Sequence, residues 1–327
     1  MTYYQGGKKR LGEDIAEVIH KIALKKYKPS SRFPTPRPGT PKGSLRGSGS
    51  PKSLRSRSPK RGDTLKGYCE PFCGMMGVYR HIPEIFDNFN GWRTSASGRG
   101  KTKLVSKKQI NSKSLSYIGG DRNPNIIKMW KALQRGWVPP TKCSRAKYNK
   151  LKPLAFRPTR SVSLDTIFLG FACSYRGSFF STYCPGNNVK HQQKSARSIG
   201  KQIKDVKLSA GDYSETVPPK LKNYIIYCDP PYRDTLNKYQ IGHQHDSYFD
   251  YPQFVKWCGR MSKNNLVFVS EYTKPCKNSR LVWKKGKEKL FLISPPRRDP
   301  KRITIKPKRK MSQKSLCPKR VFYPKKK

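Results

Sequence analysis

Acidic side chains are scarce in this sequence. Asp and Glu together number 19 in 327 residues, against 71 Lys and Arg, and the formal net charge is +52. Residues 1–67 hold 17 basic and 4 acidic side chains, residues 68–272 hold 33 and 13, and residues 273–327 hold 21 and 2. This excess argues against a protein that works alone on a small neutral metabolite. It favours a polyanionic partner, most simply a nucleic acid.

The sequence also lacks several other signals. No apolar run approaches the ~20 residues that cross a membrane, so no membrane partner is expected. The nine cysteines form no Cys-x-x-Cys pair, and no secretory signal pattern stands at the start. We therefore expect reduced thiols and an intracellular protein, in the cytoplasm or the nucleus. Cys69 with Cys73, and the cluster His243-Gln244-His245-Asp246, lack a second ligand pair, so no bound metal is expected.

Two stretches rich in Pro, Ser, Gly or basic residues, at 29–66 and 296–327, flank the middle of the chain. Such stretches cannot bury enough apolar surface to offset the entropy lost on ordering, so we predict them to be disordered. A further polar, basic stretch at 90–114 is expected to be a loop insertion. The predicted organisation is an N-terminal cofactor-binding segment and helix at 1–28, a disordered basic insertion at 29–66, a catalytic domain at 67–295 and a disordered basic tail at 296–327.

Between these stretches, apolar runs alternate with helical patterns. Spacing of apolar residues predicts helices at 11–27, 77–89, 124–135 and 251–262. Apolar runs predict strands at 67–72, 115–120, 224–228 and 266–270, and a hairpin at 281–293. Because the strand runs are continuous, we expect strands buried on both faces. The alternation predicts an α/β fold with a mostly parallel sheet. Residues 137–200 show no clear period.

Three predicted strand ends carry residues suited to ligand binding, where open α/β sheets place their ligands. The first is Glu70-Pro71-Phe72-Cys73-Gly74-Met75-Met76-Gly77, whose glycines permit close backbone approach. In the second, Gly120-Asp121-Arg122-Asn123, the acid Asp121 suits ribose hydroxyls or a helix N-cap. In the third, Asp229-Pro230-Pro231-Tyr232, the prolines end the strand and fix a turn. That turn offers two acceptors, Asp229 and the Pro230 carbonyl, beside a flat ring, which suits an exocyclic amine on a planar base.

Gly6-Gly7-Lys8, Glu70-Pro71-Phe72-Cys73-Gly74 and Asp229-Pro230-Pro231-Tyr232 occur in this order. The order resembles the DNA adenine N6-methyltransferases of the bacterial and phage Dam family, over most of the chain outside 29–66, 90–114 and the tail. The resemblance implies a Rossmann-like methyltransferase sheet with S-adenosylmethionine as cofactor and double-stranded DNA as partner. It implies site-specific methyl transfer to adenine N6 after base flipping.

Roles follow from the resemblance residue by residue. Asp229 and the Pro230 carbonyl would accept the hydrogens of the target amine, Pro231 would fix the turn, and Tyr232 would stack on the base. Met75 and Met76 depart from the family's glycine-rich turn and could crowd the cofactor. The cofactor site implied by the resemblance comprises Tyr4, Gly7, Lys8, Glu70, Phe72, Gly74, Asp121, Asp212 and Asp229.

Residues 141–200 lie where the family has its target-recognition region. Arg176 could bind a guanine edge or a phosphate there, and Tyr175 or Phe179 could wedge into the base stack. An alternative of equal weight places Phe179 in the core and leaves Arg176 solvated.

Two other functions fit the sequence. The charge, the insertions and the paired methionines are compatible with a catalytically weak or inactive, methyltransferase-derived basic DNA-binding or DNA-condensing protein. An RNA adenine methyltransferase is the third candidate. Insertions of this composition resemble those of viral or eukaryotic-host proteins, which adds packaging with viral DNA as a location. The intact Asp-Pro-Pro-Tyr turn favours the active DNA enzyme.

Overall fold

The computed structural model describes residues 8, 11–27, 63–88, 110–156, 161–233 and 249–296. Contacts divide the chain into residues 1–295 and 296–327, and every helix and strand below belongs to the first unit. The predicted disordered insertion lies outside the described residues except for 63–66, and the predicted tail except for Pro296. Most of the 90–114 insertion also lies outside them. Disorder and the predicted division into segments therefore stay predictions.

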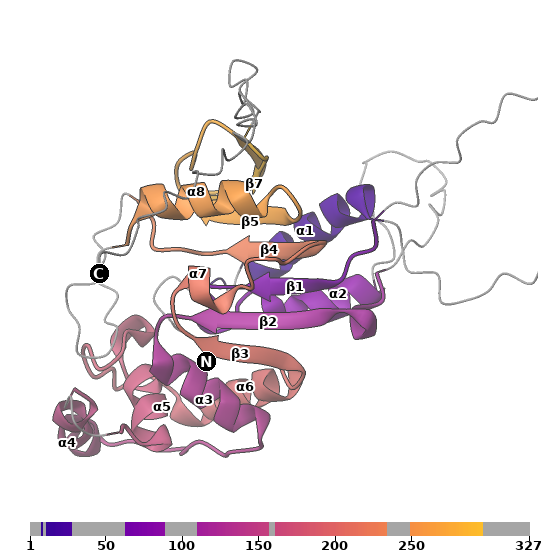
Figure 1. Cartoon of the computed structure of the whole chain (residues 1–327). Helices are drawn as coiled ribbons and strands as arrows, with labels where there is room; N and C mark the ends of the chain where they lie inside the picture. Colours follow the sequence, from indigo (N-terminus) through magenta and orange to yellow (C-terminus); the bar gives the residue numbers. More distant parts are fainter. Residues whose placement is uncertain are drawn as a thin grey trace, which may run out of the picture. The chain divides into compact units, whose positions relative to one another are not determined.

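In the described residues, seven strands form one sheet (Figure 1). Their order is β3-β2-β1-β4-β5-β7-β6. The first five are parallel, and β7 is antiparallel to both β5 and β6. This confirms the predicted α/β fold with a mostly parallel sheet. The strands are β1 (Gly67–Glu70), β2 (Ser116–Asp121), β3 (Val206–Ala210), β4 (Tyr224–Cys228), β5 (Leu266–Glu271), β6 (Ser279–Lys285) and β7 (Glu288–Ile293).

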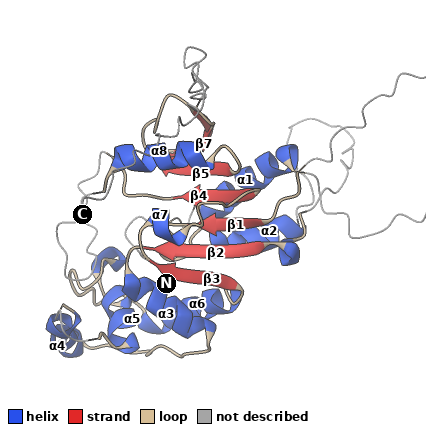
Figure 2. Cartoon of the chain, in the orientation of Figure 1, coloured by secondary structure: helices blue, strands red, loops and turns tan. Residues whose placement is uncertain are grey.

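Helices cover both faces of the sheet (Figure 2). Ile225 and Phe268 face a core shared with α1 (Gly12–Lys26), α2 (Ile82–Asn88) and α3 (Pro124–Gln134). Ile226 and Val267, their chain neighbours, face a second core shared with α7 (Tyr213–Thr216) and α8 (Tyr251–Met261). Successive strand residues point to opposite faces, so a strand buried on both sides needs a continuous apolar run.

Several elements were not predicted. They are β3, α7 and three helices in the region without a clear period: α4 (Arg145–Ala155), α5 (Leu164–Ala172) and α6 (Val189–Gln202). Ser144, Ser163 and Asn188 cap these helices, each accepting a backbone N–H with its side chain. These caps were the available sequence signal. The basic side chains of α4 and α6 obscured it. Short 3-10 turns form at η1 (Tyr79–His81), η2 (Ser112–Ser114) and η3 (Tyr175–Gly177).

The strand order reverses between β1 and β4. From β1 the sheet continues through β2 and β3 on one side, and through β4 and β5 on the other. Connections that diverge at such a point leave a crevice at the carboxyl ends of the strands. Glu70 ends β1, Asp121 ends β2, and Asp229 directly follows β4. The fold therefore gathers the three strand ends singled out above at one edge of the sheet.

Two glycines let the N-terminal segment approach this edge. A Cβ at Gly12 would collide with the backbone oxygen of Gly77, and a Cβ at Gly77 would lie 3.0 Å from the backbone nitrogen of Lys8. Side chains at these positions would therefore push α1 and Lys8 away from the turn after β1.

We expect Gly12→Ala to destabilise the fold. The added methyl group would meet a backbone oxygen rather than a flexible side chain, and overpacking of this kind costs about 1–3 kcal/mol, more than the ~1 kcal/mol that alanine gains in helix propensity. Urea denaturation measures the difference. Gly186→Ala is the control, since a Cβ there meets nothing within 4 Å. Equal stability of the two variants would contradict the close approach.

Candidate active site

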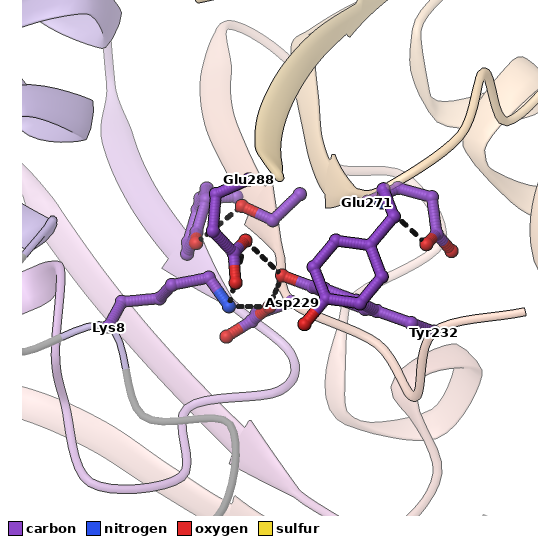
Figure 3. A network of polar contacts seen from close by, with 8 residues as sticks. Lys8, Asp229, Tyr232, Glu271 and Glu288 are labelled. Atoms are coloured by element: carbon purple, nitrogen blue, oxygen red, sulfur yellow. Dashed lines mark hydrogen bonds and ion pairs between the residues drawn. The ribbon is translucent and has the colours of Figure 1, made fainter. Parts of the chain in front are cut away.

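Lys8, Asp229 and Glu288 point toward one another at the carboxyl end of β4 (Figure 3). Lys8 Nζ lies 2.8 Å from Asp229 Oδ1 and 3.6 Å from Glu288 Oε2. The single hydrogen of the Tyr232 hydroxyl is shared between Glu288 Oε2, at 2.8 Å from the hydroxyl oxygen, and Asp229 Oδ1, at 3.2 Å. One polar network thus joins the N-terminal segment, the turn after β4 and the first residue of β7.

Burial and charge together set the protonation of this network. Lys8 is only 5% exposed. Burial lowers the pKa of its ammonium group, but the Asp229 and Glu288 carboxylates outweigh that effect, so the pKa is raised overall. Burial raises the pKa of Asp229, and the nearby Lys8 ammonium opposes this. Lys8 is therefore charged at neutral pH and is shared between two carboxyl groups.

A second acid, Glu271, holds the turn after β4. Its Oε2 accepts the backbone N–H of Arg233 at 3.1 Å, and its Oε1 accepts that of Tyr272 at 2.7 Å. Glu271 is fully buried at the end of β5. The Tyr272 ring meets the Tyr232 ring edge-on, with centroids 4.5 Å apart. The Asp-Pro-Pro-Tyr turn is therefore anchored to the neighbouring strand through its backbone and through Tyr232.

The predicted stacking residue, Tyr232, lies beyond the carboxyl end of β4 and is covered. Its side chain is 6% exposed, and Lys8 Nζ lies 4.8 Å from its ring centroid. A base that stacks on this ring must therefore displace part of its cover.

Glu70 and Asp121 flank the glycine turn after β1. Glu70 is 3% exposed and accepts the Tyr68 hydroxyl at 2.7 Å. Burial raises its pKa to about 8, and the charge of Asp229 adds to the shift. Asp121 accepts the backbone N–H of Gly74 with Oδ2 and that of Asn123 with Oδ1, both at 2.9 Å. Burial raises its pKa to about 6.

The N-cap of α3 is Asn123, so the alternative of Asp121 as the cap of that helix is wrong. Asp121 instead braces the turn after β1 against the end of β2. The turn is also held from α3, where the Trp130 indole N–H donates to the Gly74 carbonyl at 2.8 Å.

A pocket of about 500 Å³ opens beside the ends of β2 and β3. Asp212 lies in its wall and caps α7, where its Oδ1 accepts the backbone N–H of Ser214 at 2.9 Å. Phe72 stacks on Tyr213 with centroids 5.5 Å apart and meets Phe249 edge-on. The pocket thus combines a carboxylate with aromatic surface. Its lining residues are Arg122, Gly211, Asp212, Tyr213, Ser214, Glu215, Phe249, Asp250 and Gln253.

The paired methionines belong to the hydrophobic core. Met75 is 7% exposed and Met76 is fully buried, with a backbone φ of 55°. Both belong to the core cluster that α1, α2 and α3 share with the sheet. Their side chains therefore fill core volume, and crowding of the cofactor stays a prediction.

For Phe179, the structure excludes the wedge and confirms the alternative of equal weight, a place in the core. Its ring is 3% exposed and packs against Phe171 and Phe180, so it cannot wedge into a base stack without unpacking α5. Tyr175 is 54% exposed, and the Arg176 guanidinium lies 5.1 Å from its ring centroid. These two residues stay predicted DNA contacts. Tyr4, Gly7 and residues 243–246 lie outside the described residues.

Sequence reasoning missed Glu288 and Glu271. A signal existed for Glu288, because it is the only acid in a lysine-rich hairpin. For Glu271, the signal was an acid at the end of an apolar strand. Within the described ranges, no group of three or more His, Cys, Asp and Glu could hold a metal ion. No helix there is long and apolar enough to cross a membrane.

Comparison with known proteins bears on the turn after β4. Residues 172–290 match the family model of the D12 class N6 adenine-specific DNA methyltransferases. The match covers little more than a third of the chain. It spans β3 to β5, the Asp229–Tyr232 turn and Glu288, so the Dam-type resemblance is confirmed there. A comparison with curated proteins gives no match.

Three solved structures resemble the chain, and each alignment covers 71% of it. SMU.472, described as a methyltransferase and complexed with SAH, has a TM-score of 0.31 at 11% identity, over 48% of its length. The rRNA methyltransferase aviRa from Streptomyces viridochromogenes has a TM-score of 0.31 at 9% identity, over 77% of its length. A protein from Listeria monocytogenes described as an N6-adenine-specific DNA methylase has a TM-score of 0.30 at 11% identity, over 47% of its length. The chain spans about half the length of the first and third.

Glu70 should make stability depend on pH. Its pKa is about 8 in the folded protein against an ordinary 4.5, so the folded state holds a proton that the unfolded chain releases. Stability is therefore lost as pH rises from about 4.5 toward 8. Glu70→Gln removes this loss, and its melting temperature should rise relative to wild type between about pH 5 and pH 8. Glu84→Gln, on an exposed side chain of α2, is the control. A constant difference across the range would contradict the raised pKa.

Proposed function

We propose that this protein is a site-specific DNA methyltransferase that transfers a methyl group from S-adenosylmethionine to adenine N6. The observation that carries the proposal is the Asp229-Pro230-Pro231-Tyr232 turn at the reversal of strand order. There, a carboxylate that is 17% exposed lies beside an aromatic ring, in the region that matches the D12 family model.

The residues of the crevice fit this cofactor. Asp121 uses one lone pair on each oxygen for backbone N–H groups and keeps others for ribose hydroxyls. The pocket beside Asp212 and Phe249 has the aromatic and carboxylate surface that suits an adenine ring. Glu70 is a buried carboxyl that suits an ammonium group. When bound, S-adenosylmethionine supplies a methyl group on a sulfonium, which makes a covalent intermediate with the protein unnecessary.

The turn after β4 activates the target amine. The amino lone pair of adenine is delocalised into the ring and is a poor nucleophile. Asp229 and the Pro230 carbonyl lie beyond the last residue of β4, outside the sheet ladder, and accept the two amine hydrogens. This favours a pyramidal nitrogen with its lone pair directed at the methyl carbon. The rate gain then comes from positioning and from fixed acceptors in a buried site.

The proposed DNA surface includes the target-recognition region. The adenine must leave the double helix to reach a crevice of this kind. Helices α4 and α6 present exposed basic side chains that suit phosphate contacts: Arg145, Lys147, Lys150, Lys190, Lys194 and Arg197.

Asp229→Ala should abolish methyl transfer. Loss of one preorganised electrostatic contact lowers the rate on the order of 100- to 1,000-fold, whereas DNA binding, which depends on phosphate contacts, should stay close to normal. Incorporation of radiolabelled methyl groups into unmethylated DNA measures the first effect, and fluorescence anisotropy measures the second. Asp205→Ala, at an exposed side chain before β3, is the control. Full activity of Asp229→Ala would overturn the assignment.

The net charge of +52 favours a second candidate, a DNA-binding or DNA-condensing protein derived from a methyltransferase. DNA binding that is indifferent to S-adenosylmethionine, with no methyl transfer by the wild-type chain, would support it. The paired methionines were one argument for this candidate, and their place in the core weakens that argument. Competition between DNA and RNA substrates tests the RNA alternative.

Arg176→Ala should weaken DNA binding, and the pattern of the loss should show whether Arg176 contacts a phosphate or a guanine. Loss of a phosphate contact lowers the slope of log K against log salt by about 0.9 and affects all sequences alike. Loss of a guanine contact costs about 1–3 kcal/mol only at the recognised site and leaves the slope nearly unchanged. Anisotropy titrations at several salt concentrations, with target and scrambled duplexes, separate the two. Unchanged affinity for both duplexes would remove Arg176 from the DNA surface.

A further inference from the structure

Asp229 already accepts hydrogen bonds from groups that would compete with the target amine. Its Oδ1 takes the Lys8 ammonium at 2.8 Å and shares the Tyr232 hydroxyl hydrogen, at 3.2 Å, with Glu288. An ammonium on a carboxylate neutralises its charge and weakens it as an acceptor. In the proposed transfer, the bond from the amine nitrogen to the methyl carbon forms as the bond from that carbon to the sulfonium sulfur breaks, with its electron pair left on sulfur. Positive charge develops on the amine until its proton is lost to solvent. A carboxylate relieved of Lys8 stabilises that charge better.

Glu288 lies where it can take both donors. Its Oε2 already accepts the Tyr232 hydroxyl at 2.8 Å and lies 3.6 Å from Lys8 Nζ (Figure 3). A charged hydrogen bond between nitrogen and oxygen is about 2.8 Å long, so a small shift of the Lys8 side chain completes this contact. Glu288 is half-buried, and its partner Lys8 is 5% exposed.

The hairpin of β6 and β7 brings Glu288 to this place. Because β7 is antiparallel to β5, the first residues of β7 lie at the carboxyl ends of the parallel strands. Lys289 pairs with Glu271, the last residue of β5, and Glu288 precedes Lys289. Lys289 Nζ also donates to the carbonyl of Tyr272 at 2.6 Å, which ties the start of β7 to the residue packed against Tyr232.

We propose that Glu288 is a positioning residue that draws Lys8 and the Tyr232 hydroxyl away from Asp229 when the target amine binds. Movement of Lys8 toward Glu288 also shifts the ammonium that lies over the Tyr232 ring, where the base is to stack. By attracting Lys8, Glu288 would thus both leave Asp229 with its full negative charge and uncover the Tyr232 ring. This inference rests on the proposed function.

Glu288→Gln is the first test. The amide oxygen still accepts the Tyr232 hydroxyl, but the charge that attracts Lys8 is gone. We expect kcat to fall about 10- to 100-fold, the effect of one charged hydrogen bond, while KM and DNA affinity change little. Glu288→Asp keeps the charge and should recover part of kcat. A wild-type kcat in Glu288→Gln would overturn the proposal.

A double-mutant cycle tests the route through Lys8. In a Lys8→Met background, Glu288→Gln should cause little further loss, because the ammonium it acts on is absent. Losses that multiply independently would show that Glu288 acts in another way and would overturn the proposal. Glu84→Gln, an exposed acid of α2, is the matched control, and thermal melting confirms that each variant is folded.

The result for Asp229→Ala separates this inference from the proposed function. If Asp229→Ala is inactive and Glu288→Gln is fully active, only the role of Glu288 fails. If Asp229→Ala stays active, or the wild-type chain transfers no methyl group to DNA, the proposed function fails and the role of Glu288 with it.

Discussion

The buried ion pair between Lys8 and Asp229 is the constraint on which the site depends. A buried charge that loses its partner is strongly destabilising, so the N-terminal segment and the turn after β4 have to meet. That meeting requires the close approach at Gly12 and Gly77. It also requires the turn to be fixed, which Glu271 achieves through the backbone N–H groups of Arg233 and Tyr272. Segments far apart in the chain are thereby held in one arrangement.

The few acidic residues of this basic protein are concentrated at the proposed site. Acids are rare in the chain, yet Glu70, Asp121, Asp229, Glu271 and Glu288 all lie at the carboxyl edge of the sheet. A basic exterior suits phosphates. An acidic crevice suits the cationic and N–H groups of a cofactor and a target amine. The same chain therefore offers basic side chains to the phosphates of its proposed DNA substrate, and carboxyl groups to the proposed cofactor and target amine.

Much of the fold follows from local pattern. Strands β1, β2, β4 and β5 and helices α1, α3 and α8 are predicted because each buries a face large enough to fix the spacing of its apolar residues. Region 137–200 is different. Helix α6 buries Gln192 and Gln193 along with a few apolar residues, and α4 buries only Tyr148 and Ala155, so their patterns are weak. The sequence left Phe179 undecided between the core and a DNA contact, and it suggested that Met75 and Met76 could crowd the cofactor. The reason is related, since the side on which these residues are buried depends on neighbours far away in the sequence.

By itself, the sequence determined the α/β class and the three strand ends, because residue type and spacing act over a few residues. It also determined the Asp-Pro-Pro-Tyr turn, because proline limits its own backbone wherever it stands. The tertiary structure alone decided which acids share Lys8. Glu288 reaches Asp229 only because β7 is inserted antiparallel beside β5, and Glu271 reaches the turn only because β5 pairs with β4. Strand order is a property of the whole chain, and no local pattern specifies it.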